Sequence, residues 1–178
     1  IDDEVVAGGL ETVKPVKGRM EPVAVPGSDL AVIVDYSHKP EALAQALNAV
    51  RSFSAGRVWL VFGAGGNRDS AKRPLMGQIA SELADEIIVT SDNPRSEEPS
   101  EIAAEIVSGI KIETAKSKVL LDRADAIHFA VNRAQSGDSI LIAGKGHETY
   151  QEIGNEQRPF DDVKVAKEAL LERVRTSL

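Results

Sequence analysis

The sequence contains no cysteine among its 178 residues. This absence excludes disulfides, thiolate metal sites and cysteine nucleophiles, and it is compatible with a reducing cytoplasm. No apolar run in the sequence approaches the roughly 18 residues that cross a membrane. The chain opens with Ile1 and has no charged-then-apolar leader, so we expect neither membrane insertion nor export.

Basic residues are outnumbered by acidic ones, with 21 Lys and Arg against 28 Asp and Glu and a formal net charge of −7. A surface this acidic offers no basic stripe to phosphates, so we expect no nucleic-acid partner. Hydrophobic residues make up 42% of the chain, which is enough for the core of one ordinary domain.

The usual nucleotide-binding and metal-binding motifs are also missing. The G-x-x-x-x-G-K-[ST] loop that cradles ATP phosphates does not occur, because Gly146 rather than Ser or Thr follows Lys145. Gly63 and Gly65 fit the start of a dinucleotide fingerprint, but Arg68 occupies its third glycine position and disfavours NAD. No pair of histidines has the H-x-x-x-H spacing of a zinc site, so we expect no metal here.

What the sequence does contain is an alternation of short β-branched runs and amphipathic helices. This pattern is typical of βαβ units and predicts an α/β fold, a Rossmann-like three-layer domain with a mostly parallel sheet of about six strands. Strands are expected at 30–35, 58–62, 86–90, 118–121 and 139–143, with a hairpin around Gly154-Asn155. Helices are expected from Pro40, from Pro74, around 102–110, after the capping residue Asp122 and from Asp161.

Apolar spacing predicts which helix residues are buried. The first expected helix presents Leu43, Ala46, Leu47 and Val50 on one face, and the second presents Leu75, Met76, Ile79, Ala80 and Leu83. The third presents Ile102, Ala103, Ile106, Val107 and Ile110.

Unusual polar residues follow four of the expected strands. They are Asp35-Tyr36-Ser37-His38, Gly63 to Arg68, Asp92 to Arg95, and Gly144 to Glu148. Because the carboxyl ends of parallel strands form one edge of a sheet, these loops should converge on one ligand crevice. Turn formation explains any single loop equally well, but it explains four such loops less easily.

Cations concentrate in two of these loops, as Arg68, Lys72 and Arg73 in one and Arg95 in the other. The planar guanidinium suits bidentate contact with carboxylates, so two arginines with Glu148 nearby would suit a zwitterion that carries carboxylates and ammonium groups. Alternatively, each arginine pairs with a nearby acid such as Asp69 or Glu97.

The histidines differ in their surroundings. His38 and His147 each follow a strand, where ligand contact is expected, whereas His128 lies in a helical pattern and is expected to be structural or at the surface. A Ser37–His38–Asp35 triad is disfavoured, because neighbours on one loop rarely reach the required geometry.

Taken in order, the motifs resemble those of the Mur-type peptidoglycan ligases, specifically the MurE type. The resemblance rests on Gly18-Arg19-Met20-Glu21, Asp35 to Pro40, Val61 to Asp69, Lys72-Arg73-Pro74, Asp92-Asn93-Pro94-Arg95 and Gly144 to Glu148. It covers residues 18–178 and implies the C-terminal domain of such a ligase, with residues 1–17 as the tail of a preceding, central ATP-binding domain. The chain is then expected to be a fragment that holds no catalytic residue and is inactive alone.

The resemblance implies an ATP-dependent reaction in which the D-glutamate carboxylate of UDP-MurNAc-L-Ala-D-Glu becomes an acyl phosphate. The amine of meso-diaminopimelate then attacks it. Mg²⁺ is implied too, with its ligands in the central domain. The expected partners are these substrates and the other domains of the same polypeptide, and the expected location is the cytoplasm.

The resemblance also assigns residues. Contacts to meso-diaminopimelate are implied for Arg68, Asp92, Asn93, Arg95, Gly144 and Glu148. Contacts to ATP are implied for Arg19, Asp35, Tyr36 and His38. Asn67 and Ser37 depart from the commoner aspartate and alanine, and neither departure touches an implied contact.

Three alternatives stay open at this stage. They are a lysine-adding ligase, a relative of folylpolyglutamate synthetase, and a non-catalytic Rossmann-like binding module. Arg95 disfavours the first two, because lysine would leave its guanidinium unpaired in a closed site.

Overall fold

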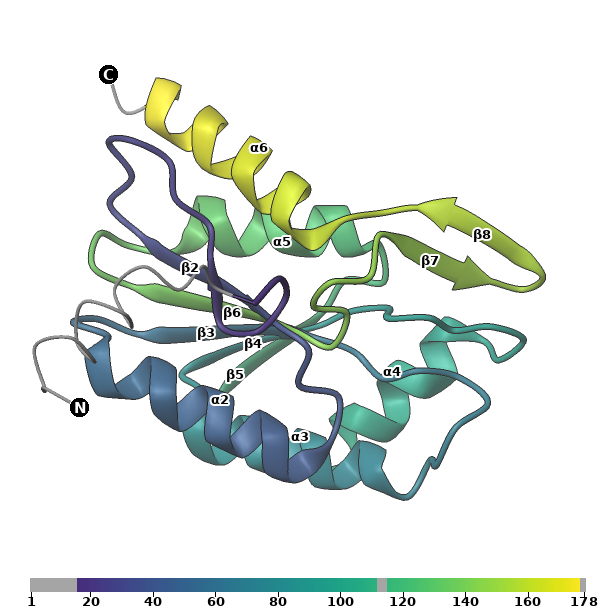
Figure 1. Cartoon of the computed structure of the whole chain (residues 1–178). Helices are drawn as coiled ribbons and strands as arrows, with labels where there is room; N and C mark the ends of the chain where they lie inside the picture. Colours follow the sequence, from purple (N-terminus) through teal and green to yellow (C-terminus); the bar gives the residue numbers. More distant parts are fainter. Residues whose placement is uncertain (1–15, 112–114, 177–178) are drawn as a thin grey trace, which may run out of the picture.

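A six-stranded sheet forms the middle layer of the computed structural model, which describes residues 16–111 and 115–176 (Figure 1). The strand order is β1-β2-β6-β3-β4-β5. The parallel strands are β2 (Ala31–Asp35), β3 (Val58–Phe62), β4 (Glu86–Val89), β5 (Lys116–Val119) and β6 (Ser139–Ala143), and β1 (Glu21–Pro22) runs antiparallel to β2. The predicted α/β fold with a mostly parallel sheet is therefore confirmed.

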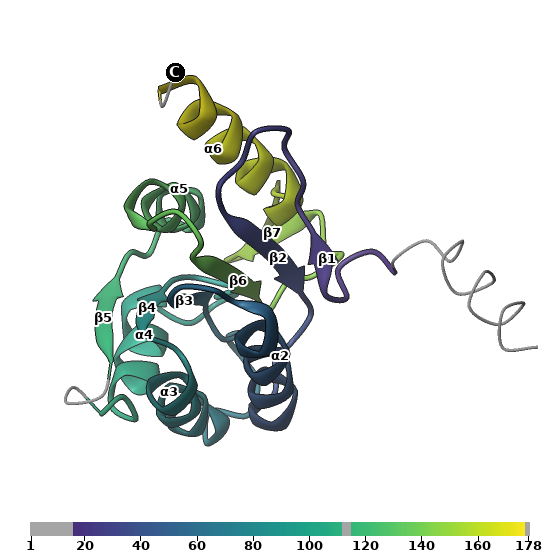
Figure 2. The same ribbon diagram turned by 90° about the vertical axis from the view of Figure 1, so that its left-hand side faces the viewer.

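Helices cover both faces of this sheet (Figure 2). One face carries α2 (Pro40–Phe53), α3 (Lys72–Leu83) and α4 (Pro99–Val107), and the other carries α5 (Arg123–Arg133) and α6 (Asp162–Thr176). Strand β3 serves both faces, since Leu60 and Phe62 pack with the first helix layer while Trp59 and Val61 pack with the second. This alternation follows from the two-residue period of a strand.

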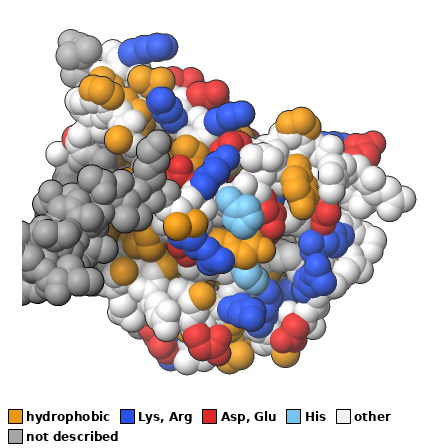
Figure 3. Space-filling view, viewed as in Figure 1, with side chains coloured by type: hydrophobic (Ala, Val, Ile, Leu, Met, Phe, Trp, Pro, Cys, Tyr) orange, Lys and Arg blue, Asp and Glu red, His pale blue; other side chains and the backbone are white. Residues whose placement is uncertain are grey.

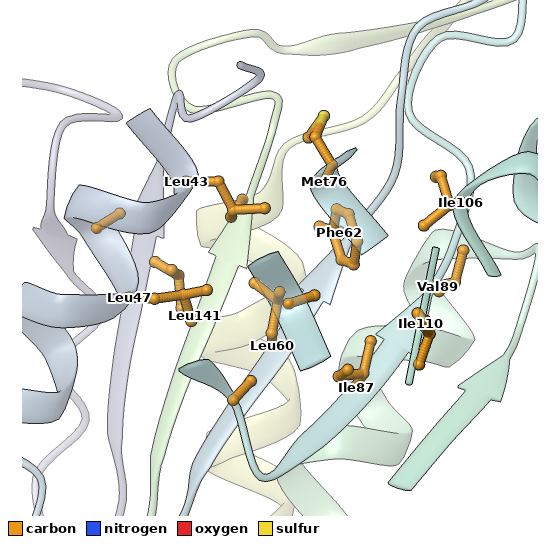
Figure 4. Close-up of a cluster of buried hydrophobic side chains, with 14 of the residues drawn as sticks. Leu43, Leu47, Leu60, Phe62, Met76, Ile87, Val89, Ile106, Ile110 and Leu141 are labelled. Atoms are coloured by element: carbon orange, nitrogen blue, oxygen red, sulfur yellow. The ribbon is translucent and has the colours of Figure 1, made fainter. Parts of the chain in front are cut away.

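A cluster of buried apolar side chains lies beneath α2, α3 and α4 (Figure 4). Leu43 and Leu47 of α2 and Met76 of α3 pack over Leu60 and Phe62, and all five side chains have 0% exposure. Burial of each such side chain stabilises the fold by about 1.5–3 kcal/mol. This packing holds in place the strand ends at which the polar loops begin.

Helix α3 departs from the prediction. It begins at Lys72 rather than Pro74, and Leu75 is 53% exposed although the apolar spacing predicted its burial. Met76 and Ala80 are buried as predicted. The buried face of α3 consists of Arg73, Met76, Gly77, Ala80 and Ser81. Leu75 lies about 100° away from Met76 on the helix and therefore misses this face.

Other boundaries shift as well, and one strand was not predicted. Strand β5 covers Lys116–Val119 rather than 118–121, and Ile110 is buried although α4 ends at Val107. The two-residue β1 is too short to show a period. Asp122 does cap α5, since its Oδ1 accepts a hydrogen bond from the Asp125 N–H at 2.9 Å.

A second, two-stranded sheet consists of β7 (Tyr150–Ile153) and β8 (Glu156–Pro159). They form the predicted hairpin, with Ile153 opposite Glu156 and Gly154 at φ +59° in the turn. The hairpin projects beyond the carboxyl ends of the parallel strands (Figure 1).

Within residues 16–111 and 115–176, no helix is long and apolar enough to cross a membrane. The expected helical tail of a preceding domain falls almost wholly on residues 1–15, which lie outside the described residues.

Candidate functional site

A cleft of about 760 Å³ lies at the carboxyl ends of the parallel strands. It joins the loops after β2, β3, β4 and β6 to strand β7. Its lining consists of Tyr36, His38, Lys39, Pro40, Glu41, Gly65, Arg68, Asp69, Ala71, Lys72, Leu75, Asp92, Asn93, Arg95, Gly144, Glu148, Tyr150 and Glu152. At this end of the molecule, histidine, lysine, arginine and acidic side chains gather on the surface (Figure 3).

The structure brings together most of the residues singled out from the sequence. Arg68, Asp92, Asn93, Arg95, Gly144 and Glu148 all line the cleft, as do Tyr36 and His38. Arg19 and Asp35 are not part of its lining. The convergence of the four polar loops is therefore observed, whereas the ligand of each residue stays a prediction.

Arg68 and Arg95 lie against the same glycine. A Cβ atom placed on Gly65 would be 3.1 Å from Arg95 Nη1 and 3.7 Å from Arg68 Cγ. Arg68 is exposed and forms no ion pair or hydrogen bond within the described part of the chain. Two arginines from the ends of different strands thus line one cleft.

Arg95 is held by several contacts. Its backbone adopts φ +54°, which is uncommon for a residue other than glycine. Its Nε pairs with Glu152 Oε2 at 2.7 Å, and its Nη1 donates to the carbonyl of Gly66 at 2.8 Å. The acid beside Arg95 is therefore on the hairpin, not the Asp69 or Glu97 that sequence proximity suggested.

Arg73 pairs with nearby acids, which is the alternative that the sequence left open for each arginine. Its side chain is 1% exposed and pairs with Glu97 at 2.8 Å and with Glu105 at 2.9 Å. Its Nη2 also donates to the Gly65 carbonyl at 3.2 Å. Arg73 thus joins α3 to α4 and supports the loop after β3 from below, outside the cleft.

A buried network forms one wall of the cleft. Lys145, with 0% exposure, donates from Nζ to Asn93 Oδ1 at 2.9 Å and to Glu148 Oε2 at 3.1 Å. Asn93 Nδ2 donates to Glu148 Oε2 at 2.8 Å. The bonds from Lys145 and Asn93 to Glu148 both end on Oε2, so Glu148 Oε1 stays available as an acceptor for a cationic ligand group.

Asp92 is an unusual carboxyl group in this wall. It is buried, and its carboxylate accepts no hydrogen bond from the described residues. Burial raises its pKa, while the charges of Arg123 and Lys145 act in the opposite direction. Burial also lowers the pKa of Lys72, whose Nζ donates to the His38 carbonyl at 2.7 Å across the cleft.

The loop after β2 forms an aromatic cluster beside the cleft. The Arg19 guanidinium lies 4.8 Å from the centre of the Tyr36 ring, and the rings of His38 and His147 lie 4.6 Å and 5.0 Å from it. Such contacts are favourable between a cation and an aromatic face. Arg19 therefore presents its charge near the cleft but outside its lining.

Asp35 already has internal partners. Its Oδ2 accepts from the Met20 N–H at 2.8 Å, and its Oδ1 accepts from the Ser37 hydroxyl. His38 Nδ1 instead lies 2.9 Å from the Tyr36 carbonyl, so these residues form no catalytic triad, as the sequence predicted. Asp35 anchors the turn at Gly18 to Met20 and supports Arg19 indirectly.

One expectation outside the cleft, that for His128, also finds a place in the structure. His128 lies on α5, 3.4 Å from Glu172 of α6, which fits the surface role predicted for it. Among the described residues, no group of three or more His, Asp or Glu side chains could hold a metal ion.

Several residues of this region were not predicted as ligand contacts. Lys72, Tyr150 and Glu152 line the cleft, and Lys145 lies behind it. The sequence does mark Lys145, because a glycine stands on each side of it. Gly144 at φ +117° and Gly146 at φ +52° turn the chain sharply there. Glu152 had none, since nothing in the hairpin sequence indicates its contact with Arg95.

Comparison with known proteins places the chain in a family. The family model described as Mur ligase, glutamate ligase domain, matches residues 18–146. The UDP-N-acetylmuramoyl-L-alanyl-D-glutamate--2,6-diaminopimelate ligase of Synechocystis sp. is 52% identical over 174 residues, which are 97% of this chain and 34% of that protein. The ligase of the same name from Geobacillus kaustophilus is 49% identical over 170 residues, covering 96% and 35%.

Solved structures agree. A UDP-N-acetylmuramoyl-L-alanyl-D-glutamate--2,6-diaminopimelate ligase superposes with a TM-score of 0.83 at 39% identity, covering 97% of this chain and 35% of that chain. UDP-N-acetylmuramate-alanine ligase from Thermotoga maritima shares the fold, with a TM-score of 0.63 at 18% identity, covering 100% and 34%. This chain spans about a third of the length of the curated relatives it matches. The chain belongs to the Mur ligase family and contains its glutamate ligase domain.

Proposed function

We propose that this chain is the amino-acid-recruiting domain of an ATP-dependent ligase that adds meso-diaminopimelate to UDP-MurNAc-L-Ala-D-Glu. Relatives that carry this activity in their names match nearly the whole chain. The observation that carries the proposal is the cleft itself, in which Arg68 and Arg95 lie together while Glu148 lines the same cavity. Diaminopimelate carries two carboxylates and two ammonium groups, which these charges complement.

Arg95 is the proposed selector of the second carboxylate, the group that distinguishes diaminopimelate from lysine. A bidentate guanidinium–carboxylate pair is strong and directional. Lysine would leave Arg95 without this partner in a closed site, which costs binding free energy. Glu148 Oε1 and the Gly144 carbonyl would accept from an ammonium group at the other end, and Asn93 holds Glu148 in place.

In the proposed reaction, phosphoryl transfer from ATP converts the D-glutamate carboxylate to an acyl phosphate and releases ADP. The amine nitrogen attacks the carbonyl carbon, an amide bond forms, phosphate leaves and the nitrogen loses a proton. The contribution of this domain is to hold the amine in attack geometry, which lowers the barrier by several kcal/mol (about 7 or more in well-oriented systems). Closure over the rest of the ligase would exclude water.

The nucleotide is proposed to meet this domain beside the Tyr36 ring. Arg19 offers a cation there, over the Tyr36 ring that His38 also contacts. Asp35 could reach a ribose hydroxyl only through lone pairs that its bonds to Met20 and Ser37 leave over. The described residues include no candidate metal cluster, so Mg²⁺ ligands are proposed to lie in another part of the polypeptide. Because its proposed substrates are ATP and a UDP-linked sugar, we place the ligase in the cytoplasm.

An amine-donor panel on the complete ligase tests this function. With ATP, Mg²⁺ and UDP-MurNAc-L-Ala-D-Glu supplied, we expect meso-diaminopimelate to be ligated and lysine to be a poor substrate. Arg95→Ala should raise the KM for meso-diaminopimelate on the order of 100-fold, as for truncation of one partner in a desolvated charge pair.

Arg158→Ala is the matched control, since Arg158 is an exposed arginine of the same hairpin that pairs with Glu156. It should leave the KM unchanged. Preference for lysine would indicate a lysine-adding ligase, and a complete protein that ligates no amine would support a binding module instead.

A further inference from the structure

Strand β7 contacts two polar residues of the loop after β4, Asn93 and Arg95. The Glu152 N–H donates to Asn93 Oδ1 at 3.0 Å, and the Glu152 carbonyl accepts from the Arg95 N–H at 3.0 Å. The Glu152 carboxylate adds the 2.7 Å pair with Arg95 Nε. The Arg95 carbonyl in turn accepts from the Gly154 N–H at 2.6 Å. One hairpin residue thus fixes two residues that lie nearly 60 positions earlier.

The carboxylate of Glu152 decides which edge of the Arg95 guanidinium can meet a ligand. A guanidinium has five N–H donors in a rigid fork. Glu152 takes the Nε donor, and the Gly66 carbonyl takes one of the two Nη1 donors. The donors that stay available are one on Nη1 and both on Nη2. Because pairing along the side of the fork needs Nε, a carboxylate can pair bidentately only with the end of the fork, through one N–H of Nη1 and one of Nη2.

The hairpin contact matters because the Arg95 backbone is unusual. A non-glycine residue at φ +54° is held in a sparsely populated conformation and needs its surroundings to keep it there. The two backbone bonds to the hairpin and the Glu152 ion pair supply this restraint. The ion pair is only partly shielded, with 27% of the Arg95 side chain and 25% of the Glu152 side chain exposed. Arg95 is therefore anchored and still reachable from the cleft.

Building on the proposed function, we propose that Glu152 is a positioning residue that sets amino-acid selectivity by presenting the end of the Arg95 guanidinium to the second carboxylate of the substrate. Glu152 does not bind that carboxylate, because like charges repel. Its effect passes through Arg95. The hairpin is thereby part of the selectivity apparatus although it lies outside the six-stranded sheet.

Kinetics of the complete ligase test this role. Glu152→Ala removes the Nε partner and lets the guanidinium rotate, so the KM for meso-diaminopimelate should rise about tenfold, as for loss of one charged hydrogen bond. The kcat and the KM for ATP should change little. Glu152→Gln keeps an oxygen acceptor for Nε and should restore most of the affinity. Selectivity over lysine should fall in Glu152→Ala by the same factor, because lysine has no second carboxylate to lose.

Two further variants separate positioning from general damage to the hairpin. Glu156→Ala removes an exposed carboxylate of β8 that pairs with Arg158, and it should leave every kinetic constant unchanged. In an Arg95→Ala background, Glu152→Ala should have no further effect on the KM, because Glu152 is proposed to act only through the Arg95 side chain.

The inference is overturned if Glu152→Ala binds meso-diaminopimelate like the unmodified enzyme, or if its effect adds fully to that of Arg95→Ala. It is also overturned if Glu152→Ala raises the KM for lysine and the KM for meso-diaminopimelate by the same factor. The proposed function fails separately, when Arg95→Ala itself leaves the KM for meso-diaminopimelate unchanged.

Discussion

The ammonium group of Lys145 donates to Asn93 Oδ1 at 2.9 Å, and this bond decides which end of the Asn93 amide meets Glu148. Because Oδ1 accepts from both Lys145 and the Glu152 N–H, the amide nitrogen must turn towards Glu148 Oε2. A lysine with 0% exposure is expensive to bury, and its bonds to Asn93 and Glu148 offset that cost.

Lys145→Met tests this arrangement, since methionine fills similar space without the charge. Asn93 and Glu148 would each lose a fixed partner, so we expect the KM for meso-diaminopimelate to rise about tenfold or more in the complete ligase. Lys118→Met is the control, because Lys118 lies over the Phe129 ring, away from the cleft. Equal KM values for the two variants would remove Lys145 from the site.

Asp92 should make stability depend on pH. Burial raises its pKa in the folded state, so at neutral pH the folded chain either holds a proton there or bears a buried charge. At about pH 3 the carboxyl is protonated in both states and costs nothing. As the pH rises past the ordinary carboxyl pKa, the unfolded state ionises first, and the free energy of unfolding falls until the folded pKa is passed.

Asp92→Asn removes this titration. The variant should gain stability relative to the unmodified chain as the pH rises from about 3 to 8, which urea denaturation at several pH values can measure. In the complete ligase the same variant should bind the amino acid more weakly. A stability difference that is constant over this pH range contradicts the assignment.

Gly66 permits the close approach of two loops. Its N–H donates to the Asn93 carbonyl at 2.8 Å, and a Cβ atom at this position would overlap the carbonyl of Pro94. Gly66→Ala must therefore push the loop after β4 away from the loop after β3. We expect a loss of about 1–3 kcal/mol in unfolding free energy, as for overpacking, together with a raised KM for meso-diaminopimelate.

Gly137→Ala is a matched glycine control. Gly137 has φ +86° and lies far from the cleft, and a Cβ there would be 3.9 Å from Ala55 Cβ. It should lose about 1 kcal/mol through backbone strain, with an unchanged KM. If both variants raise the KM alike, instability rather than loop separation is the cause.

The sequence was informative where a repeating pattern reports burial. The continuous apolar run Val58–Phe62 and the helical spacing of Leu43 and Leu47 identified the strands and helices, and the strand ends then located the cleft. Leu75 was misassigned, because an apolar residue at helical spacing can also sit at the rim of a cleft. Single-residue spacing does not distinguish these two environments.

Contacts between side chains of distant loops could not be predicted in this way. The pairing of Arg95 with Glu152 rather than Glu97 depends on how the hairpin folds back over the loop after β4. No periodicity encodes that return, because it is set by a left-handed turn at Gly154 and by backbone bonds to Arg95. The loops of the cleft were thus foreseen, and its internal charge pairing was not.

A fully buried ion pair between α5 and α6 lies beneath the loops that follow β4 and β6. Arg123 Nε and Asp162 Oδ1 lie 2.7 Å apart, and both side chains have 0% exposure. Arg123 also donates to the carbonyls of Ser91 at 3.3 Å and Ala143 at 3.1 Å, at the ends of β4 and β6. Arg123 therefore ties two strand ends together beneath Asp92 and Gly144.

Arg123→Met should leave the Asp162 carboxylate buried without its partner, at a cost of about 3–5 kcal/mol in the free energy of unfolding measured by denaturation. The double variant Arg123→Met/Asp162→Leu should recover much of this loss, since no buried charge is then left unpaired. Arg158→Ala, at an exposed pair, should cost less than about 1 kcal/mol. If the double variant is less stable than Arg123→Met alone, the carbonyl bonds of Arg123 rather than its charge dominate, and the ion-pair account is wrong.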